Sequence, residues 1–219
     1  MGEGKKVHLR LKLRPPQLAD FSFSTLERGK MNTKTKKLTM LGLFCAIAYI
    51  FTCIGNLIPV RFAGFLNFDP KDAIIVIAGF ALGPLAAVIV SLVVALIELI
   101  SISGTGPIGF LMNVIASTSF ALLPTILYNK NRKFKVAMLG LLASSLMTVG
   151  VMMLWNWLVT PGYMHVPREM VEEMLLPTFL PFNALKCLIN TVLIAVLYKP
   201  TVRILRRVKL LEPSKKQNK

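Results

Sequence analysis

Five long stretches of this chain carry almost no charged side chains, and they constrain its fold more than any other feature. They are residues 38–60, 73–102, 108–128, 136–159 and 178–198. Each approaches or exceeds the roughly 20 residues that an α-helix needs to cross the hydrocarbon core of a bilayer. The chain is 54% hydrophobic and 16% charged, which is more apolar than a soluble domain of this length. We therefore predict an all-α integral membrane protein.

The stretch at residues 73–102 is too long for a single crossing. The segment "GFALGPL" interrupts it, and Gly83 with Pro84 is typical of a turn between two helices. This division predicts a six-transmembrane-helix bundle over residues 36–203, with a short second span. Residues 1–35 are expected to be a basic, poorly ordered cytoplasmic leader without a secretory signal, and residues 204–219 a basic cytoplasmic tail. Met31, before "NTKTKKLTM", would itself make a sensible start.

The formal net charge of +16 first suggests nucleic-acid binding, because basic chains with a high pI often bind phosphates. The distribution of the cations favours another explanation. They gather before the first span, between the fourth and fifth, and after the sixth: Lys34, Lys36, Lys37, Lys130, Arg132, Lys133, Lys135, Arg203, Arg206, Arg207 and Lys209. With six spans, these clusters share one side, as the positive-inside rule requires of the cytoplasm. We expect both termini in the cytoplasm and no nucleic-acid partner.

Polar side chains occur inside the predicted spans near their outer ends. They are Glu98, Asn113, Asn156, Asn183 and Lys186. At about 100° per residue, Asn183, Lys186 and Asn190 fall on one face of the sixth helix. A cation at the bilayer centre costs about 2.5 to 3.5 kcal/mol on insertion scales. Snorkelling toward the interface would explain Lys186 alone, but the neighbouring polar groups favour an inward, partnered lysine, with Glu98 either its counter-ion or a ligand contact.

Aromatic side chains surround these polar groups in the sequence: Trp155, Trp157, Tyr163, Phe179 and Phe182. An aromatic belt at the membrane interface explains each ring alone. Together with several carboxamides and one cation, the rings also fit an outward-open pocket for a planar heteroaromatic solute. Asn side chains donate and accept hydrogen bonds at once, which matches an imide-like ring edge.

Two external segments are distinctive. The loop at 60–72, within "PVRFAGFLNFDPKD", is apolar enough to fold over the bundle as a lid, with Phe68 and Asp69 as lid residues. Asp69 and Asp72 are better explained as helix-starting residues, with a proline inside the first turn. The loop "TPGYMHVPREMVEEMLLP" is expected to contain a short surface helix.

Sequence motifs of several enzyme classes are absent from the chain. There is no phosphate-binding G-x-x-x-x-G-K-[ST] loop, no H-E-x-x-H and no G-x-S-x-G. Cys45, Cys53 and Cys187 lack metal-ligand spacing and are expected to be packing residues. We therefore expect neither an ATPase nor another enzyme, and no resident cofactor or metal. A small membrane protein that binds a solute without its own motor remains.

Four segments carry a resemblance to a known family: "NFDPKDAIIVIAGFALGPLAAV", "TGPIGFLMN", "WNWLVTPGY" and "LPFNALK". In this order, on six short spans, they resemble the substrate-binding S-components of energy-coupling factor (ECF) vitamin transporters, in particular the riboflavin-binding members. The resemblance runs from about Lys36 to Arg203.

The resemblance implies a multi-pass protein of the bacterial cell membrane. Such a protein captures riboflavin outside and delivers it inward by associating with a membrane scaffold subunit and two cytoplasmic ATPases. By motif match, Asn156, Asn183 and Lys186 are ligand-binding positions, and the loop before "DPKD" is the gate. Asn113, Glu98, Trp155 and Phe182 complete the candidate site.

The resemblance also implies a docking face, since the family uses small residues of the first helix to contact the scaffold. Here Gly42 and Ala46 in "GLFCA" fit the rule, although glycine replaces the first alanine. Packing inside the bundle is the alternative for this pair. For the whole chain, the alternatives are a different vitamin, a structural membrane protein without a solute, or a lipid-directed enzyme using His165 or Glu98. FMN is a further possible ligand.

Overall fold

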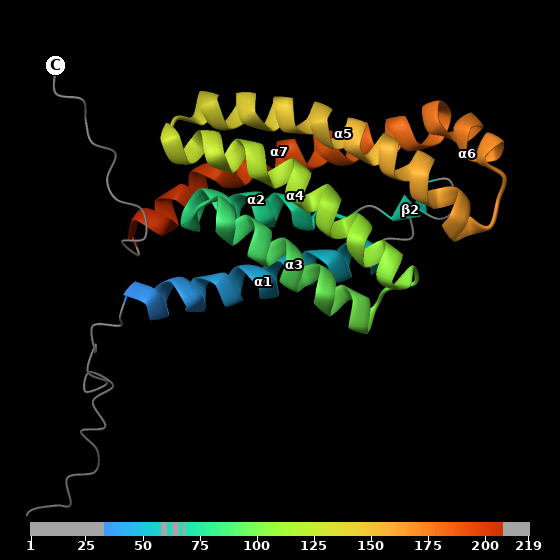
Figure 1. The fold of residues 1–219 in the computed structure, drawn as a ribbon. Helices are drawn as coiled ribbons and strands as arrows, with labels where there is room; N and C mark the ends of the chain where they lie inside the picture. Colours follow the sequence, from blue (N-terminus) through green and yellow to red (C-terminus); the bar gives the residue numbers. More distant parts are fainter. Residues whose placement is uncertain (1–32, 58–60, 63–65, 68, 208–219) are drawn as a thin grey trace, which may run out of the picture.

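The computed structural model describes residues 33–57, 61–62, 66–67 and 69–207. Its elements are α1 (Thr33–Leu57), β1 (Arg61–Phe62), β2 (Leu66–Asn67), α2 (Lys71–Leu82), α3 (Pro84–Ser101), α4 (Gly106–Lys130), α5 (Phe134–Met164), α6 (Arg168–Met174), the π-helical segment η1 (Leu175–Phe179) and α7 (Leu180–Arg207). The long helices lie side by side in one bundle, and α1 begins at the same end at which α7 finishes (Figure 1). The bundle confirms the predicted all-α class, with one addition, the two-residue antiparallel pair β1–β2.

The second predicted span, α2, is much shorter than the others. Among the described residues, five helical segments are long and apolar enough to cross a membrane: α1, α3, α4, α5 and the continuous segment α6–η1–α7. The 12 residues of α2 extend only about 18 Å, less than the roughly 30 Å of a bilayer core. Instead α2 packs against α1, α3, α4 and α7, and every residue from Lys71 to Ala81 is buried. This short helix is the centre of the bundle.

The turn predicted at "GFALGPL" is confirmed. Gly83 separates α2 from α3 with φ of 104°, a conformation that glycine adopts without steric cost. Pro84 then opens α3, where its missing N–H is not needed.

Helix boundaries at the opposite end of the bundle differ from those expected. The fifth span continues beyond residue 159, through Pro161, and ends at Met164. The surface helix expected in the following loop is α6. The helix expected to begin near residue 178 is α7, which starts at Leu180, and the π-helical η1 joins it without a break to α6.

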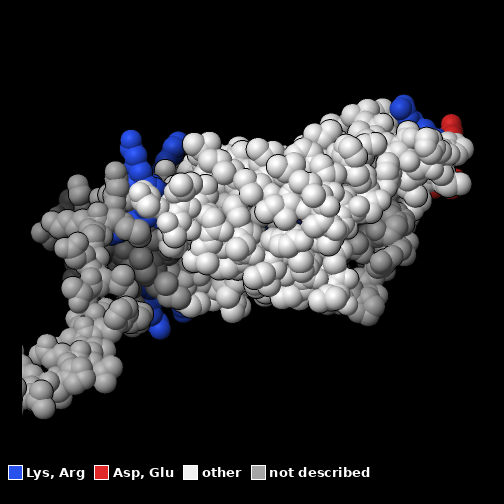
Figure 2. Space-filling view, turned by 90° about the horizontal axis from the view of Figure 1, so that it is seen from below, with Lys and Arg blue, Asp and Glu red and all other residues white. Residues whose placement is uncertain are grey.

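Charged side chains gather at the two ends of the bundle (Figure 2). Lys and Arg lie at the end that holds Thr33 and Arg207, whereas α6 at the opposite end carries acidic groups beside Arg168. The surface between the two ends is white in this view. Large apolar residues such as Leu96, Leu146 and Val196 are exposed on the long helices. An apolar girdle between two polar ends is the pattern of a helical membrane protein.

Helices α4 and α5 approach each other closely at Gly140. A Cβ placed on Gly140 of α5 would lie 2.7 Å from the Cα of Pro124 in α4. Because the obstructing atom belongs to the backbone, no side-chain rotation relieves the clash. Gly140 therefore sets the distance between these two helices.

We predict that Gly140→Ala lowers the midpoint of thermal unfolding in detergent, because overpacking at such a site costs about 1 to 3 kcal/mol. The matched control is Gly150→Ala in the same helix, where an added Cβ meets nothing within 4 Å. The control should leave the midpoint unchanged or slightly higher. Equal losses in both variants would contradict the close approach of α4 and α5.

Candidate functional site

Five charged side chains lie inside the bundle or at its edge around the start of α2: Asp69, Lys71, Asp72, Glu98 and Lys186. None exposes more than 15% of its side chain, and Lys71 exposes 1%. An unpaired charge is very costly in such surroundings. Each of the five groups accordingly has an oppositely charged partner.

Lys71 is the most deeply buried cation and has two carboxylate partners. Its Nζ is paired with Asp69 and donates to Glu98 Oε2 at 2.6 Å. Asp69 also accepts the Lys71 backbone N–H at 3.1 Å, so its carboxylate satisfies the first N–H of α2 from the position before the N-cap residue, Pro70. Pro70, however, precedes the first turn and does not lie inside it, because α2 begins at Lys71.

Lys186 has a different partner from the one considered in the sequence. Its Nζ lies 3.2 Å from Asp72 Oδ2, and Asp72 Oδ1 accepts a hydrogen bond from Ser117 of α4 at 2.5 Å. Glu98, at the end of α3, is the partner of Lys71 instead. Of the two roles considered for Glu98, that of counter-ion to Lys186 is therefore contradicted, whereas a ligand contact stays a prediction. Asp72 is a site residue that the sequence reasoning treated mainly as a helix start.

Asn190 links α7 to the start of α2. Its Oδ1 accepts the Ala73 backbone N–H at 3.0 Å. Its Nδ2 donates to the carbonyl of Lys186 at 3.0 Å and to that of Asp69 at 3.4 Å. The carboxamide thereby gives the Ala73 N–H, in the first turn of α2, a second partner beside the Pro70 carbonyl at 3.3 Å.

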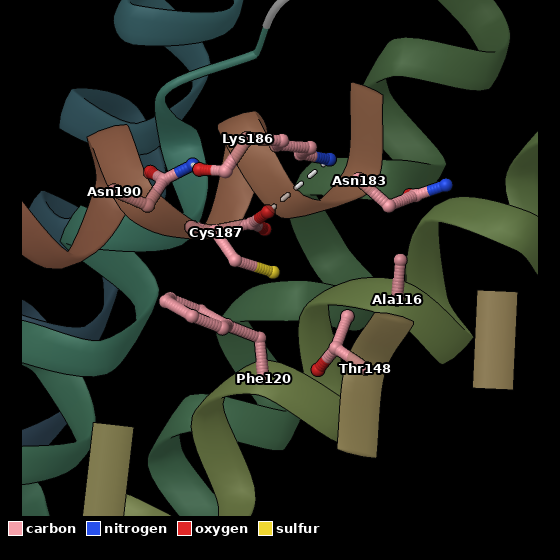
Figure 3. A pocket seen from close by; sticks show the side chains of 8 residues that line it. Ala116, Phe120, Thr148, Asn183, Lys186, Cys187 and Asn190 are labelled. Atoms are coloured by element: carbon pink, nitrogen blue, oxygen red, sulfur yellow. Dashed lines mark hydrogen bonds and ion pairs between the residues drawn. The ribbon is translucent and has the colours of Figure 1, made fainter. Parts of the chain in front are cut away.

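A small pocket of about 10 Å³ lies between α2, α4, α5 and α7. It has room for about one water molecule, so a larger ligand requires the surrounding side chains or helices to move apart. Its lining residues are Asp72, Ala116, Phe120, Thr148, Asn183, Lys186, Cys187 and Asn190. Figure 3 shows α7 contributing its polar groups from one side and α4 and α5 closing the opposite side. Asn183, Lys186 and Asn190 all line it, so the prediction that they share one inward face is confirmed.

Other expected site residues lie away from this lining. Asn156 is buried in α5, where it donates to the Met152 carbonyl at 2.7 Å and accepts from Thr160 at 3.0 Å. Asn113, Trp155 and Phe182 are half-buried. Phe68 of the expected lid falls outside the described residues. The structure thus brings Asn183 and Lys186 together but leaves the binding roles of the remaining positions as predictions.

The remaining candidates sit on surfaces. Gly42 and Ala46 are exposed on α1, and nothing lies within 4 Å of a Cβ added at Gly42. They are therefore not packed inside the bundle, which was the alternative explanation for the pair. Trp157 donates to Glu172 at 2.8 Å, and Arg168 lies 4.8 Å from its ring centre. This ring therefore fastens α6 to α5 and does not face the pocket.

Comparison with known proteins gives consistent matches. The family model for the ECF transporter substrate-specific component matches residues 36–198. The riboflavin transporter RibU of Staphylococcus aureus (strain TCH60) is 27% identical over 188 residues, covering 83% of this chain and 98% of that protein. The riboflavin transporter FmnP of Bacillus subtilis (strain 168) is 28% identical over 175 residues, covering 75% and 91%. A solved S component of a bacterial ECF transporter aligns with a TM-score of 0.67 at 26% identity, covering 78% of this chain and 98% of that one.

The buried pairing of Lys71 generates a prediction about stability. Lys71→Met should lower the free energy of unfolding by about 3 to 5 kcal/mol, because Asp69 and Glu98 lose their partner. Glu98→Gln should cost less, since Lys71 keeps Asp69. Lys135→Met, at an exposed position, is the control. Thermal unfolding in detergent checks the order, and a Lys71 variant as stable as the Lys135 variant would contradict the pairing.

Proposed function

This chain belongs to the substrate-specific components of ECF transporters, and on that premise we propose that it binds riboflavin in the pocket around Lys186. It is a transport component of the cell membrane. In this proposal it captures the vitamin outside and delivers it inward when coupled to a membrane scaffold subunit and two ATPases. The observation that carries the proposal is the ammonium of Lys186, whose side chain is 14% exposed and which pairs with Asp72 in a pocket that four helices form.

The chemistry of the lining suits a neutral, planar ligand with a polar edge. An ammonium carries three donors, and Asp72 accepts one of them. Asn183 donates to the Phe179 carbonyl at 2.8 Å, and its own oxygen is an acceptor that suits a ring N–H. Phe120 and Ala116 supply apolar walls on the opposite side. FMN has the same ring system, so we extend the proposal to FMN.

We further propose that α2 is the short second of six spans and that both termini are cytoplasmic. The concentration of Lys and Arg at the end holding Thr33 and Arg207 supports this orientation (Figure 2). Leu180 begins α7 at the end opposite to this basic end, and Lys186 lies only about 9 Å along the helix from it. The pocket is then closer to the outside, as capture of an external solute requires.

Coupling is proposed to use the exposed face of α1. Gly42 and Ala46 are spaced four apart and both point away from the bundle. Two small residues at this spacing allow another helix to approach closely. Their exposure supports docking of the scaffold subunit at this face.

The binding proposal predicts that Lys186→Met weakens riboflavin affinity by about tenfold to a hundredfold, the range for a lost hydrogen bond to a charged group. Quenching of riboflavin fluorescence by purified protein measures the affinity. The variant also leaves Asp72 unpaired, so a second variant separates the two effects. Asp72→Asn combined with Lys186→Met removes both charges and should recover thermal stability without recovering affinity. Wild-type affinity in either variant would overturn the role of Lys186.

The coupling proposal predicts that Ala46→Trp abolishes riboflavin uptake by cells that also contain the scaffold and ATPases. Riboflavin binding by the purified variant should stay unchanged, because Ala46 does not line the pocket. Leu146→Trp, on an exposed face of α5, is the control and should support normal uptake. Normal uptake by the Ala46 variant would show that the scaffold docks elsewhere.

A further inference from the structure

The described part of the chain holds four buried side-chain hydroxyls without a hydrogen-bond partner: Ser91, Thr118, Thr148 and Thr191. Other hydroxyls inside the helices bond to a carbonyl one turn earlier, as Thr52 does to Ala48 at 3.2 Å and Thr125 to Ala121 at 2.8 Å. Of the four unpaired groups, Thr148 is the one that lines the pocket.

An unpaired hydroxyl in this position carries a free-energy cost. Leaving a buried donor or acceptor unsatisfied costs about 1 to 3 kcal/mol. Thr148 exposes only 5% of its surface, so it has little access to outside partners. A polar group from a ligand in the pocket would remove that cost.

On the buried face of α5, the hydroxyl of Thr148 lacks a hydrogen-bond partner, whereas polar side chains farther along that face bond to each other. Thr148, Met152, Asn156 and Thr160 are all buried and follow one another at intervals of four residues. Asn156 and Thr160 already bond to each other at 3.0 Å. Thr148 lies roughly 12 Å from Asn156 toward the start of α5, and its hydroxyl has no such partner.

Across the pocket, Thr148 faces the groups to which the ligand is assigned. Its side chain rises from α5 toward Ala116, with Asn183 and Lys186 on the far side (Figure 3). A rotation about one bond exchanges the hydroxyl and methyl groups of a threonine. The hydroxyl therefore reaches the pocket without movement of the backbone.

We propose that Thr148 is a further ligand-binding residue, whose hydroxyl forms a hydrogen bond with a carbonyl, ring nitrogen or hydroxyl of the bound flavin. This inference rests on the proposed function. It places a ligand contact on α5 opposite the cation of α7. The ligand is then held from two sides of the pocket.

The test compares threonine-to-valine changes inside and outside the pocket, using riboflavin as the probe. Thr148→Val removes the hydroxyl and preserves the shape of the side chain. It should weaken riboflavin affinity about tenfold, as for one lost hydrogen bond of ~1.4 kcal/mol. Without riboflavin, its thermal unfolding midpoint should equal or exceed that of the wild type, because an unsatisfied hydroxyl is gone. A purely structural role for Thr148 would not combine lower affinity with retained stability.

Two further variants complete the test. Thr191→Val removes another unpaired buried hydroxyl, one that does not line the pocket, and should keep wild-type affinity. Thr148→Ser keeps the hydroxyl and should bind within about twofold of the wild type.

Three results would overturn the role of Thr148: unchanged affinity in Thr148→Val, equal losses in Thr148→Val and Thr191→Val, or a loss in Thr148→Ser as large as that in Thr148→Val. If wild-type protein bound no riboflavin, the proposed function would fail together with this inference. Tight binding by the wild type and by Thr148→Val would leave the proposed function standing and reject Thr148 alone.

Discussion

The burial of charge around the start of α2 is the constraint on which the rest of this structure depends. Lys71 and Lys186 lie among three carboxylates, each within reach of an opposite charge. Because an ion in an apolar interior is stable only when it is paired, the helices that carry these groups must keep a fixed depth and rotation. Lys71 ties α2 to α3, and Asp72 ties α2 to α4 and α7.

The same pairs explain how a short helix can occupy the centre of the bundle and also define a pocket. The residues of α2 from Lys71 to Ala81 are buried, so its position is set by its neighbours and not by lipid. Asp72 then presents a carboxylate to α7 and holds the ammonium of Lys186 beside Asn183. A ligand that enters must share Lys186 with Asp72, which favours solutes whose polar edge complements an ammonium and a carboxamide.

Much of this arrangement could be predicted from the sequence. The uncharged stretches gave the helical membrane class, Gly83 and Pro84 gave the turn, and the spacing of Asn183, Lys186 and Asn190 gave their common face. These features are local, because helix periodicity and backbone preferences determine them. The extension of α5 through Pro161 was missed, since a proline near the end of a predicted span normally indicates its end.

The pairing of the charges could not be predicted in the same way. Nothing in the sequence of α2 distinguishes its faces, because it is buried on all sides and is apolar throughout after Asp72. Its rotation, and therefore the choice of Asp72 as the partner of Lys186, depends on contacts with α1, α3, α4 and α7. Glu98 and Asp72 carry the same charge, so only the three-dimensional packing decides which of them pairs with Lys186. For the same reason, the sequence could not predict that the hydroxyl of Thr148 lacks a hydrogen-bond partner.

The most direct test of the central claim, that the pocket around Lys186 holds a flavin, is the visible absorption spectrum of the detergent-purified protein. It is followed by mass analysis of the small molecule released on denaturation. We expect a yellow protein that releases about one riboflavin per chain, if the pocket around Lys186 holds one ligand. A colourless preparation that also failed to quench the fluorescence of added riboflavin would contradict it.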